Sequence, residues 1–137
     1  MSENWIVPCN VKFYDVVSHL EKNKSIVWRK VSAIKKGDTV YLYISAPYSE
    51  IKFRCNVVND NVDEETIELN AYAIKKTEGY RKPRYIQLEL EYVYPSGELS
   101  LEKLRSHGLG QTQTQARTDR KLQAFIDKVN ESLTPNK

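Results

Sequence analysis

The sequence predicts a single α+β domain in which a small, twisted mixed sheet or partial barrel is flanked by helices. The chain has 137 residues, 40% of them hydrophobic and 28% charged, which suits one compact core rather than two. Apolar residues alternate with polar ones through the middle of the chain, whereas helical stripes occur near both ends. Because neither a repeat nor a linker interrupts this pattern, we expect one domain over residues 1–137 with about five to six strands.

Alternating runs predict the strands. In residues 39–44, Val40, Leu42 and Ile44 alternate with polar or tyrosine positions, and residues 51–57 continue the alternation after a connector. Such runs are typical of half-buried antiparallel strands. The predicted strands are 4–9, 39–44, 51–57, 66–75 and 85–94, with 26–29 as a short apolar island between them.

Helices are predicted at three places. After the first strand, Asn10 is a candidate N-cap for a stripe that fades in the polar stretch 21–25. A short helix over 99–105 is followed by glycines, and a closing helix is expected with Thr118 or Asp119 as its N-cap. The stripes consist of Phe13, Val16, Val17 and Leu20 in the first helix and Leu122, Phe125, Ile126, Val129 and Leu133 in the last.

The composition argues against a disulfide-rich secreted protein and against a membrane protein. The chain has two cysteines, which cannot build a disulfide framework, and we read neither a signal peptide nor a run long enough for a membrane span. A cytoplasmic protein is therefore expected, without contact with a membrane. The net charge is +3, and it is concentrated in the stretch KKTEGYRKPR. This basic loop could hold phosphates or could be a solvated turn.

Motifs for catalysis and for metals are weak. Cys55 alternates onto an apolar face and is expected in the core, and the two histidines lie in no nucleophile signature. Neither a zinc-type spacing nor a calcium loop is present in the sequence, so no metal and no cofactor are expected. Glu89 and Glu91 read as a solvated strand face rather than as an acid–base pair.

Two aromatic residues stand outside this pattern. Trp28 lies in no periodic segment, and Tyr48 lies in the connector SAPYS; polar residues with short side chains surround both in the sequence. A flat aromatic wall with a few directed polar groups suits the binding of a planar heterocycle. The alternatives are that Trp28 packs in the core and that Tyr48 caps a hairpin, and the residues alone leave both open.

The segments NWIVPCN, VWRK and IKKGDTVYLYISAPYSEIKFRCNV resemble the EVE domain, a member of the PUA-like superfamily related to YTH and ASCH domains. The late segment LEKLRSHGLGQTQTQARTDRKLQAFI also resembles these chains, so the resemblance spans nearly the whole sequence. It implies a small β-barrel-like sheet with helices. It also implies a non-catalytic monomer that reads a modified, and in particular a methylated, base in DNA or RNA, with a nuclease or another defence protein as a further partner.

The resemblance also implies which residues form the base pocket. They are Pro8, Cys9 and Asn10 at the end of the first strand, Trp28 and Arg29, and Ser45, Ala46, Pro47 and Tyr48 in the connector. A flipped base would stack on Trp28, facing Tyr48, while Asn10 and Ser45 bind its edge. The basic residues expected to hold phosphates are Lys75, Lys76, Arg81, Lys82 and Arg84.

The sequence leaves two rival functions. A small amidohydrolase-like enzyme on the related ASCH scaffold would need a buried lysine or carboxylate beside Tyr48, where the sequence offers only Arg29. A module that binds a small ligand or another protein is the second rival. A panel of oligonucleotides with methylated, hydroxymethylated and unmodified bases separates these three functions.

Overall fold

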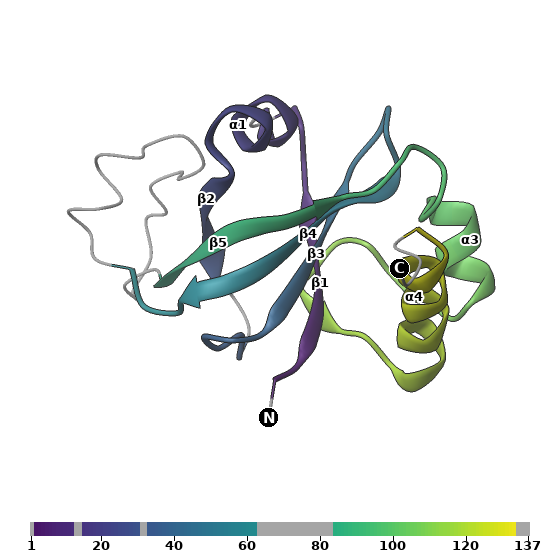
Figure 1. The fold of residues 1–137 in the computed structure, drawn as a ribbon. Helices are drawn as coiled ribbons and strands as arrows, with labels where there is room; N and C mark the ends of the chain where they lie inside the picture. The colour runs from purple at the N-terminus through teal and green to yellow at the C-terminus, as the bar shows by residue number, and fades with distance from the viewer. Residues whose placement is uncertain (1, 13–14, 31–32, 63–83, 134–137) are drawn as a thin grey trace.

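The fold is an open, curled six-stranded sheet with helices at its end and over one face (Figure 1). The computed structural model describes residues 2–12, 15–30, 33–62 and 84–133. The sheet order is β2-β5-β4-β3-β1-β6. The elements are β1 (Asn4–Cys9), α1 (Val16–Asn23), β2 (Ser25–Lys30), β3 (Thr39–Ile44), β4 (Glu50–Asn59), β5 (Arg84–Val93), α3 (Leu101–Ser106), β6 (Ala116–Arg117) and α4 (Arg120–Leu133).

Strand pairing confirms the α+β class that the alternation predicts. β1 pairs with β3 in parallel, and the other pairings are antiparallel. The two edges of the sheet approach each other without forming a ladder: the Gln115 side-chain amide donates to the backbone oxygen of Arg29 at 2.7 Å. The sheet is therefore curled rather than closed into a barrel.

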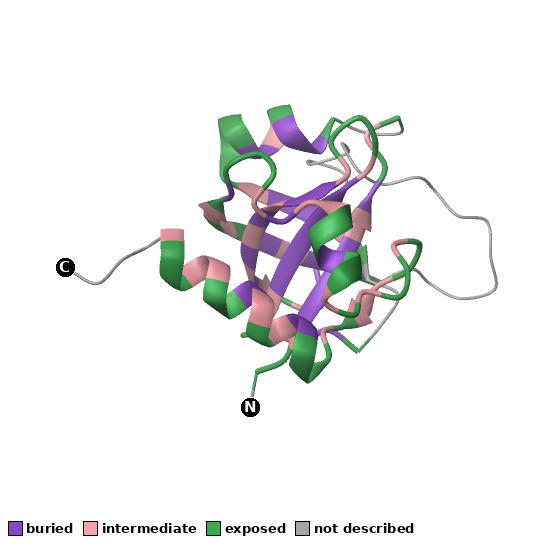
Figure 2. Cartoon of the chain, turned by 90° about the vertical axis from the view of Figure 1, so that its right-hand side faces the viewer, coloured by how far each residue is buried: buried purple, intermediate pink, exposed green. Residues whose placement is uncertain are grey.

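Each face of the sheet carries its own hydrophobic cluster. The inner cluster includes Val7, Leu42 and Phe53 and is covered by α1, whereas the outer cluster includes Tyr43 and Ile51 and is covered by α3 and α4. A bulge in the β3–β4 pairing shifts the register between Leu42 and Tyr43, which explains why neighbouring odd-numbered residues of β4 reach opposite faces. Figure 2 shows the strands buried over most of their length behind helices with exposed outer sides.

Helix starts correct one prediction and confirm another. α1 begins after Asp15, whose carboxylate accepts from the backbone N–H of Ser18 at 3.1 Å, whereas the Asn10 side chain accepts from Lys12 N–H in a separate turn. Asn10 is thus not the N-cap, because the chain first makes this Asx turn. In α4, Asp119 accepts from Leu122 N–H at 2.8 Å, so the cap predicted there is confirmed.

The remaining elements differ from the prediction in detail. The apolar island at 26–29 is β2, an edge strand paired with β5. The two-residue strand β6 was not predicted, because a strand of this length leaves no periodic signal. The strand predicted over 66–75 lies outside the described residues. No helix in the described parts of the chain combines the length and the hydrophobicity needed to cross a bilayer.

Candidate functional site

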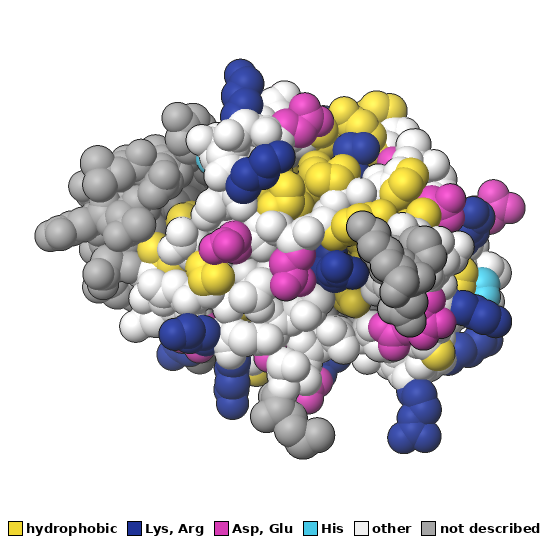
Figure 3. All heavy atoms as spheres, viewed as in Figure 1, with side chains coloured by type: hydrophobic (Ala, Val, Ile, Leu, Met, Phe, Trp, Pro, Cys, Tyr) yellow, Lys and Arg dark blue, Asp and Glu magenta, His cyan; other side chains and the backbone are white. Residues whose placement is uncertain are grey.

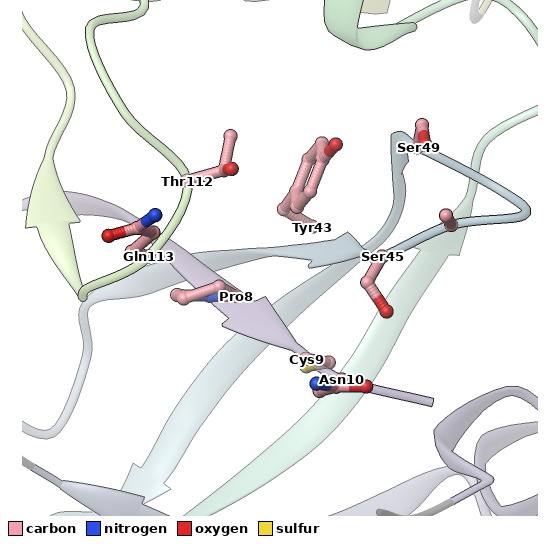
Figure 4. A pocket seen from close by; sticks show the side chains of 9 residues that line it. Pro8, Cys9, Asn10, Tyr43, Ser45, Ser49, Thr112 and Gln113 are labelled. Carbon is pink, nitrogen blue, oxygen red and sulfur yellow. The ribbon is translucent and has the colours of Figure 1, made fainter. Parts of the chain in front are cut away.

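A pocket of about 510 Å³ lies where β1 and β3 end (Figure 4). Because these strands are parallel neighbours, their carboxyl ends meet at one edge of the sheet, with Pro8 paired to Tyr43 and Cys9 to Ile44. Figure 4 shows Tyr43 between Thr112 on one side and Ser49 on the other. The lining residues are Pro8, Cys9, Asn10, Tyr43, Ser45, Ala46, Ser49, Thr112 and Gln113.

Backbone hydrogen bonds fix two walls of this pocket. Ser45 N–H donates to the Cys9 carbonyl at 3.0 Å, and the Ser45 hydroxyl accepts from Val11 N–H at 3.2 Å. These bonds join the segment after β1 to the connector of residues 45–49. At the far end of the connector, Leu101 N–H donates to the Ser49 carbonyl at 2.9 Å, so α3 holds that end in place.

The third wall comes from the loop between α3 and β6. Its shape depends on Gln111, whose side-chain oxygen accepts from the N–H groups of Gln113 at 2.7 Å and Thr114 at 3.0 Å. This turn brings Thr112 and Gln113 to the pocket. The sequence prediction missed both residues; the only signal was a run of alternating threonine and glutamine with no periodic apolar partner.

The lining is uncharged and rich in hydrogen-bonding groups. The side chains of Tyr43, Ser49, Thr112 and Gln113 line the pocket and make no hydrogen bond to any other residue that the structure describes. The polar atoms of Ser49, Thr112 and Gln113 are therefore available to a ligand, whereas Tyr43 is only 4% exposed. Cys9 is buried, and burial, followed by the nearby Cys55, raises the pKa of its thiol well above the usual value. The thiol therefore stays protonated at neutral pH.

Five of the nine residues predicted for the base pocket lie together in this lining: Pro8, Cys9, Asn10, Ser45 and Ala46. Trp28 is not among the lining residues. It is half-buried on β2 and packs against the inner cluster. Its surroundings are therefore those of the alternative in which Trp28 packs in the core. Arg29 is exposed, and it contacts the α3–β6 loop through its backbone oxygen.

Pro47 and Tyr48 are exposed at the tip of the connector, outside the pocket lining. Tyr48 has 41% of its surface exposed, and the Lys52 ammonium lies 5.7 Å from its ring centroid. Of the predicted phosphate-binding residues, Arg84 begins β5 and is exposed. Lys75, Lys76, Arg81 and Lys82 lie outside the described residues.

Within the described ranges, no group of three or more histidine, cysteine, aspartate or glutamate residues could hold a metal ion. The two cysteines are both buried as free thiols.

Comparisons with known proteins identify the fold. No family model matches the sequence, and no curated protein matches it. Among solved structures, a hypothetical protein from Leishmania major is 18% identical, with 97% of each chain covered and a TM-score of 0.67. A mutant of ZmASCH from Zymomonas mobilis is 12% identical over 93% of this chain and 96% of the other, with a TM-score of 0.65.

A protein from Pseudomonas putida is also similar, with 14% identity, coverage of 92% of this chain and 98% of the other, and a TM-score of 0.66. At these identities the likeness concerns the fold alone. It shows the α+β fold that this chain shares with ZmASCH, while the resemblance to the PUA-like superfamily and to the EVE domain stays a prediction. The chain therefore has the α+β fold of the ASCH proteins.

Proposed function

We propose that this protein binds nucleic acid without catalysing a reaction, and that one base enters the pocket at the ends of β1 and β3. The observation that carries this proposal is the uncharged lining, which combines the Tyr43 ring with hydroxyl and amide groups that lack partners among the described residues. A nucleobase is a neutral, planar heterocycle, and its recognition requires an aromatic or apolar contact and a few hydrogen bonds to its edge.

The pocket supplies these contacts from separate elements. Tyr43 projects from β3, and Gln113 provides an amide that can donate and accept at once. Pro8 and Ala46 add apolar surface that a methyl group on the base would contact. We therefore propose that a methylated base binds more tightly than an unmodified one. Tyr43, rather than Trp28, is the aromatic residue in this proposal; because its side chain is only 4% exposed, the base contacts the small part of it that reaches the pocket.

The same lining supports binding rather than catalysis. None of its described residues is a carboxylate, a histidine, a lysine or an arginine, so general acid–base chemistry lacks its usual groups. The nucleophile candidate Cys9 is buried with a raised pKa, which opposes thiolate formation. The amidohydrolase-like rival needs such groups in the pocket.

Fluorescence anisotropy with labelled single-stranded DNA and RNA oligonucleotides tests the proposal. The panel contains unmodified cytosine and adenine, methylated and hydroxymethylated cytosine, and methyladenine, measured at low salt because salt weakens phosphate contacts. We expect binding, with the highest affinity for a methylated base. Thr112→Val combined with Gln113→Ala should weaken binding roughly tenfold, because the base loses hydrogen bonds at its edge.

Thr114→Val is the matched control. Thr114 is exposed in the same loop but does not line the pocket, so its substitution should leave the affinity unchanged. Absence of binding to every oligonucleotide, or an equal loss in both variants, would contradict the proposal. Mass spectrometry of the oligonucleotides after incubation tests the non-catalytic part, which a change in base mass would refute.

A further inference from the structure

We propose that an aromatic–basic strip, formed by Tyr48, Lys52, Arg54 and Tyr92, binds the nucleotides that adjoin the base in the pocket, and that the ligand is therefore single-stranded. The proposal rests on the proposed function of the pocket and adds a second surface and a strand type. The strip differs from the basic loop that the sequence indicates, because its members lie on the 45–49 connector, β4 and β5.

The strip begins at the rim of the pocket. Tyr48 shares its connector with Ser45, Ala46 and Ser49, which line the pocket. Its ring is 41% exposed. The Lys52 ammonium lies over one face of the ring, 5.7 Å from its centroid, so a base stacks on the opposite face or displaces this cation. A nucleotide next to the bound base would thus meet a ring for its base and a cation for its phosphate.

The strip continues along β4 and β5. Arg54 pairs in register with Tyr92, and its guanidinium carbon lies 5.3 Å from the Tyr92 ring centroid. The Tyr92 ring is held edge-on by Tyr94, with centroids 5.0 Å apart. The neighbouring Val93 is 43% exposed. Figure 3 shows hydrophobic side chains gathered over the start of β4 and the end of β5 beside α3, with basic side chains among them.

Alternating rings and cations suit an unpaired strand. Bases of a single strand offer open faces that stack on aromatic side chains, while lysine and arginine contact the phosphates between them. In a duplex these faces are stacked on one another, so the rings would have no partner. Tyr48 and Val93 are the exposed large hydrophobic residues of the described chain, which places its most accessible apolar surface on or beside the strip.

The carboxylate of Glu91 would compete with a phosphate for Arg54 of the strip. Glu91 Oε1 lies 3.5 Å from Arg54 Nε, and both side chains reach solvent, with relative exposures of 44% and 25%. A phosphate that binds Arg54 must displace or share this carboxylate. Glu91→Gln should therefore strengthen the binding of an oligonucleotide by up to about fivefold, since surface ion pairs contribute roughly 0–1 kcal/mol.

The test compares two probes with the intact protein: a mononucleotide carrying the preferred base, which reaches the pocket alone, and a single-stranded octanucleotide with that base near its centre. Tyr48→Ala should weaken binding of the octanucleotide roughly 5- to 100-fold and leave the mononucleotide unaffected. Tyr48→Phe keeps the ring and should retain affinity.

Lys52→Gln with Arg54→Gln should lower the salt dependence of octanucleotide binding by about 0.7 in log–log slope for each lost phosphate contact. Lys128→Gln, which removes an exposed cation on α4, is the matched control and should have little effect. Circular dichroism checks that each variant is folded.

The outcomes separate the two proposals. If Tyr48→Ala and the double glutamine variant leave octanucleotide binding unchanged while the Thr112 and Gln113 variant weakens it, the strip proposal is wrong and the pocket proposal stands. If a duplex of the same sequence binds as tightly as the single strand, the strand type is wrong. If neither probe binds the wild-type protein, both proposals fail.

Discussion

Asp38→Ala is expected to lower the free energy of unfolding by roughly 3 kcal/mol or more, because its carboxylate satisfies several donors at once. Asp38 is 3% exposed. It accepts from Glu3 N–H, from the Trp5 indole N–H and from Lys35 N–H, each at 2.9 Å. Alanine would leave these donors unpaired at the junction of β1 with the turn before β3, and buried unpaired donors are costly.

The turn itself explains why an aspartate can serve three donors. Gly37 adopts a left-handed φ of +93° and donates to the Val57 carbonyl at 2.8 Å, and this conformation turns the next residue inward. Asp38→Asn keeps the shape but offers one acceptor oxygen in place of two. We expect it to fall between wild type and alanine.

Urea unfolding followed by tryptophan fluorescence measures the effect, with Asp60→Ala as the matched control. Asp60 accepts one bond, from Lys36 N–H at 2.8 Å, near the surface, so its loss should cost about 1 kcal/mol or less. Equal destabilisation by the two variants would contradict the assigned role of Asp38.

The carboxylate of Asp38 should also make the free energy of unfolding decrease at acidic pH. Burial alone would raise the pKa of Asp38, but the hydrogen bonds from Glu3, Lys35 and Trp5, with the charge of Lys35, outweigh it and lower the pKa below its usual value. The folded state thus releases this proton more readily than the unfolded chain. The resulting stability is present above about pH 4 and is lost as the pH falls through the folded pKa. Asp38→Asn should flatten this decrease.

The central strands β3 and β4 were predictable because their signal is local. Alternation assigns Val40, Leu42 and Ile44 to one face, and all three are fully buried in the inner cluster. The opposite face carries Tyr41 and Tyr43, which were expected to point away from that core and in fact form a second one beneath α3 and α4. Alternation identifies two faces, but it does not say that helices from the far end of the chain cover the second.

Part of the pocket could be predicted because its residues lie at or directly after the ends of predicted strands. Pro8 to Asn10 and Ser45 with Ala46 follow two strands, and the resemblance to a known domain indicated that they belong together. Thr112 and Gln113 join them from a loop more than sixty positions further on. Their approach depends on the turn around Gln111 and on the Gln115 bond to Arg29. A single sequence contains no local signal for such long-range contacts.

Tyr94→Ala should destabilise the protein by roughly 3–5 kcal/mol, the range typical of removing a large buried aromatic side chain. Tyr94 is 1% exposed and belongs to the outer cluster with Leu104 of α3 and Ile126 of α4. Its hydroxyl donates to the Asn130 side-chain oxygen at 2.5 Å. The residue thus joins the end of β5 to both helices, and alanine would leave a cavity at that junction.

Tyr94→Phe separates packing from the hydrogen bond. It keeps the ring, so we expect a loss of only about 1 kcal/mol in urea unfolding. Exposed Tyr48→Ala is the matched aromatic control and should change stability by less than about 0.5 kcal/mol. A Tyr94→Ala variant as stable as this control would show that the outer cluster does not depend on the ring.

The dependence of the unfolding free energy on alkaline pH tests the role of Tyr94 independently. Burial, the dominant cause, raises the pKa of Tyr94 to about 12, although Arg54 opposes it, and burial also raises the pKa of Tyr41. Because the unfolded tyrosine ionises near pH 10, the folded state holds its proton longer than the unfolded chain. The contribution of Tyr94 to stability is complete below about pH 10 and is lost as the pH rises toward its folded pKa. Tyr94→Phe removes this ionisation, so its unfolding free energy should fall less steeply above pH 10, with the remaining slope shared by Tyr41 and the buried thiols of Cys9 and Cys55, whose pKa values burial also raises.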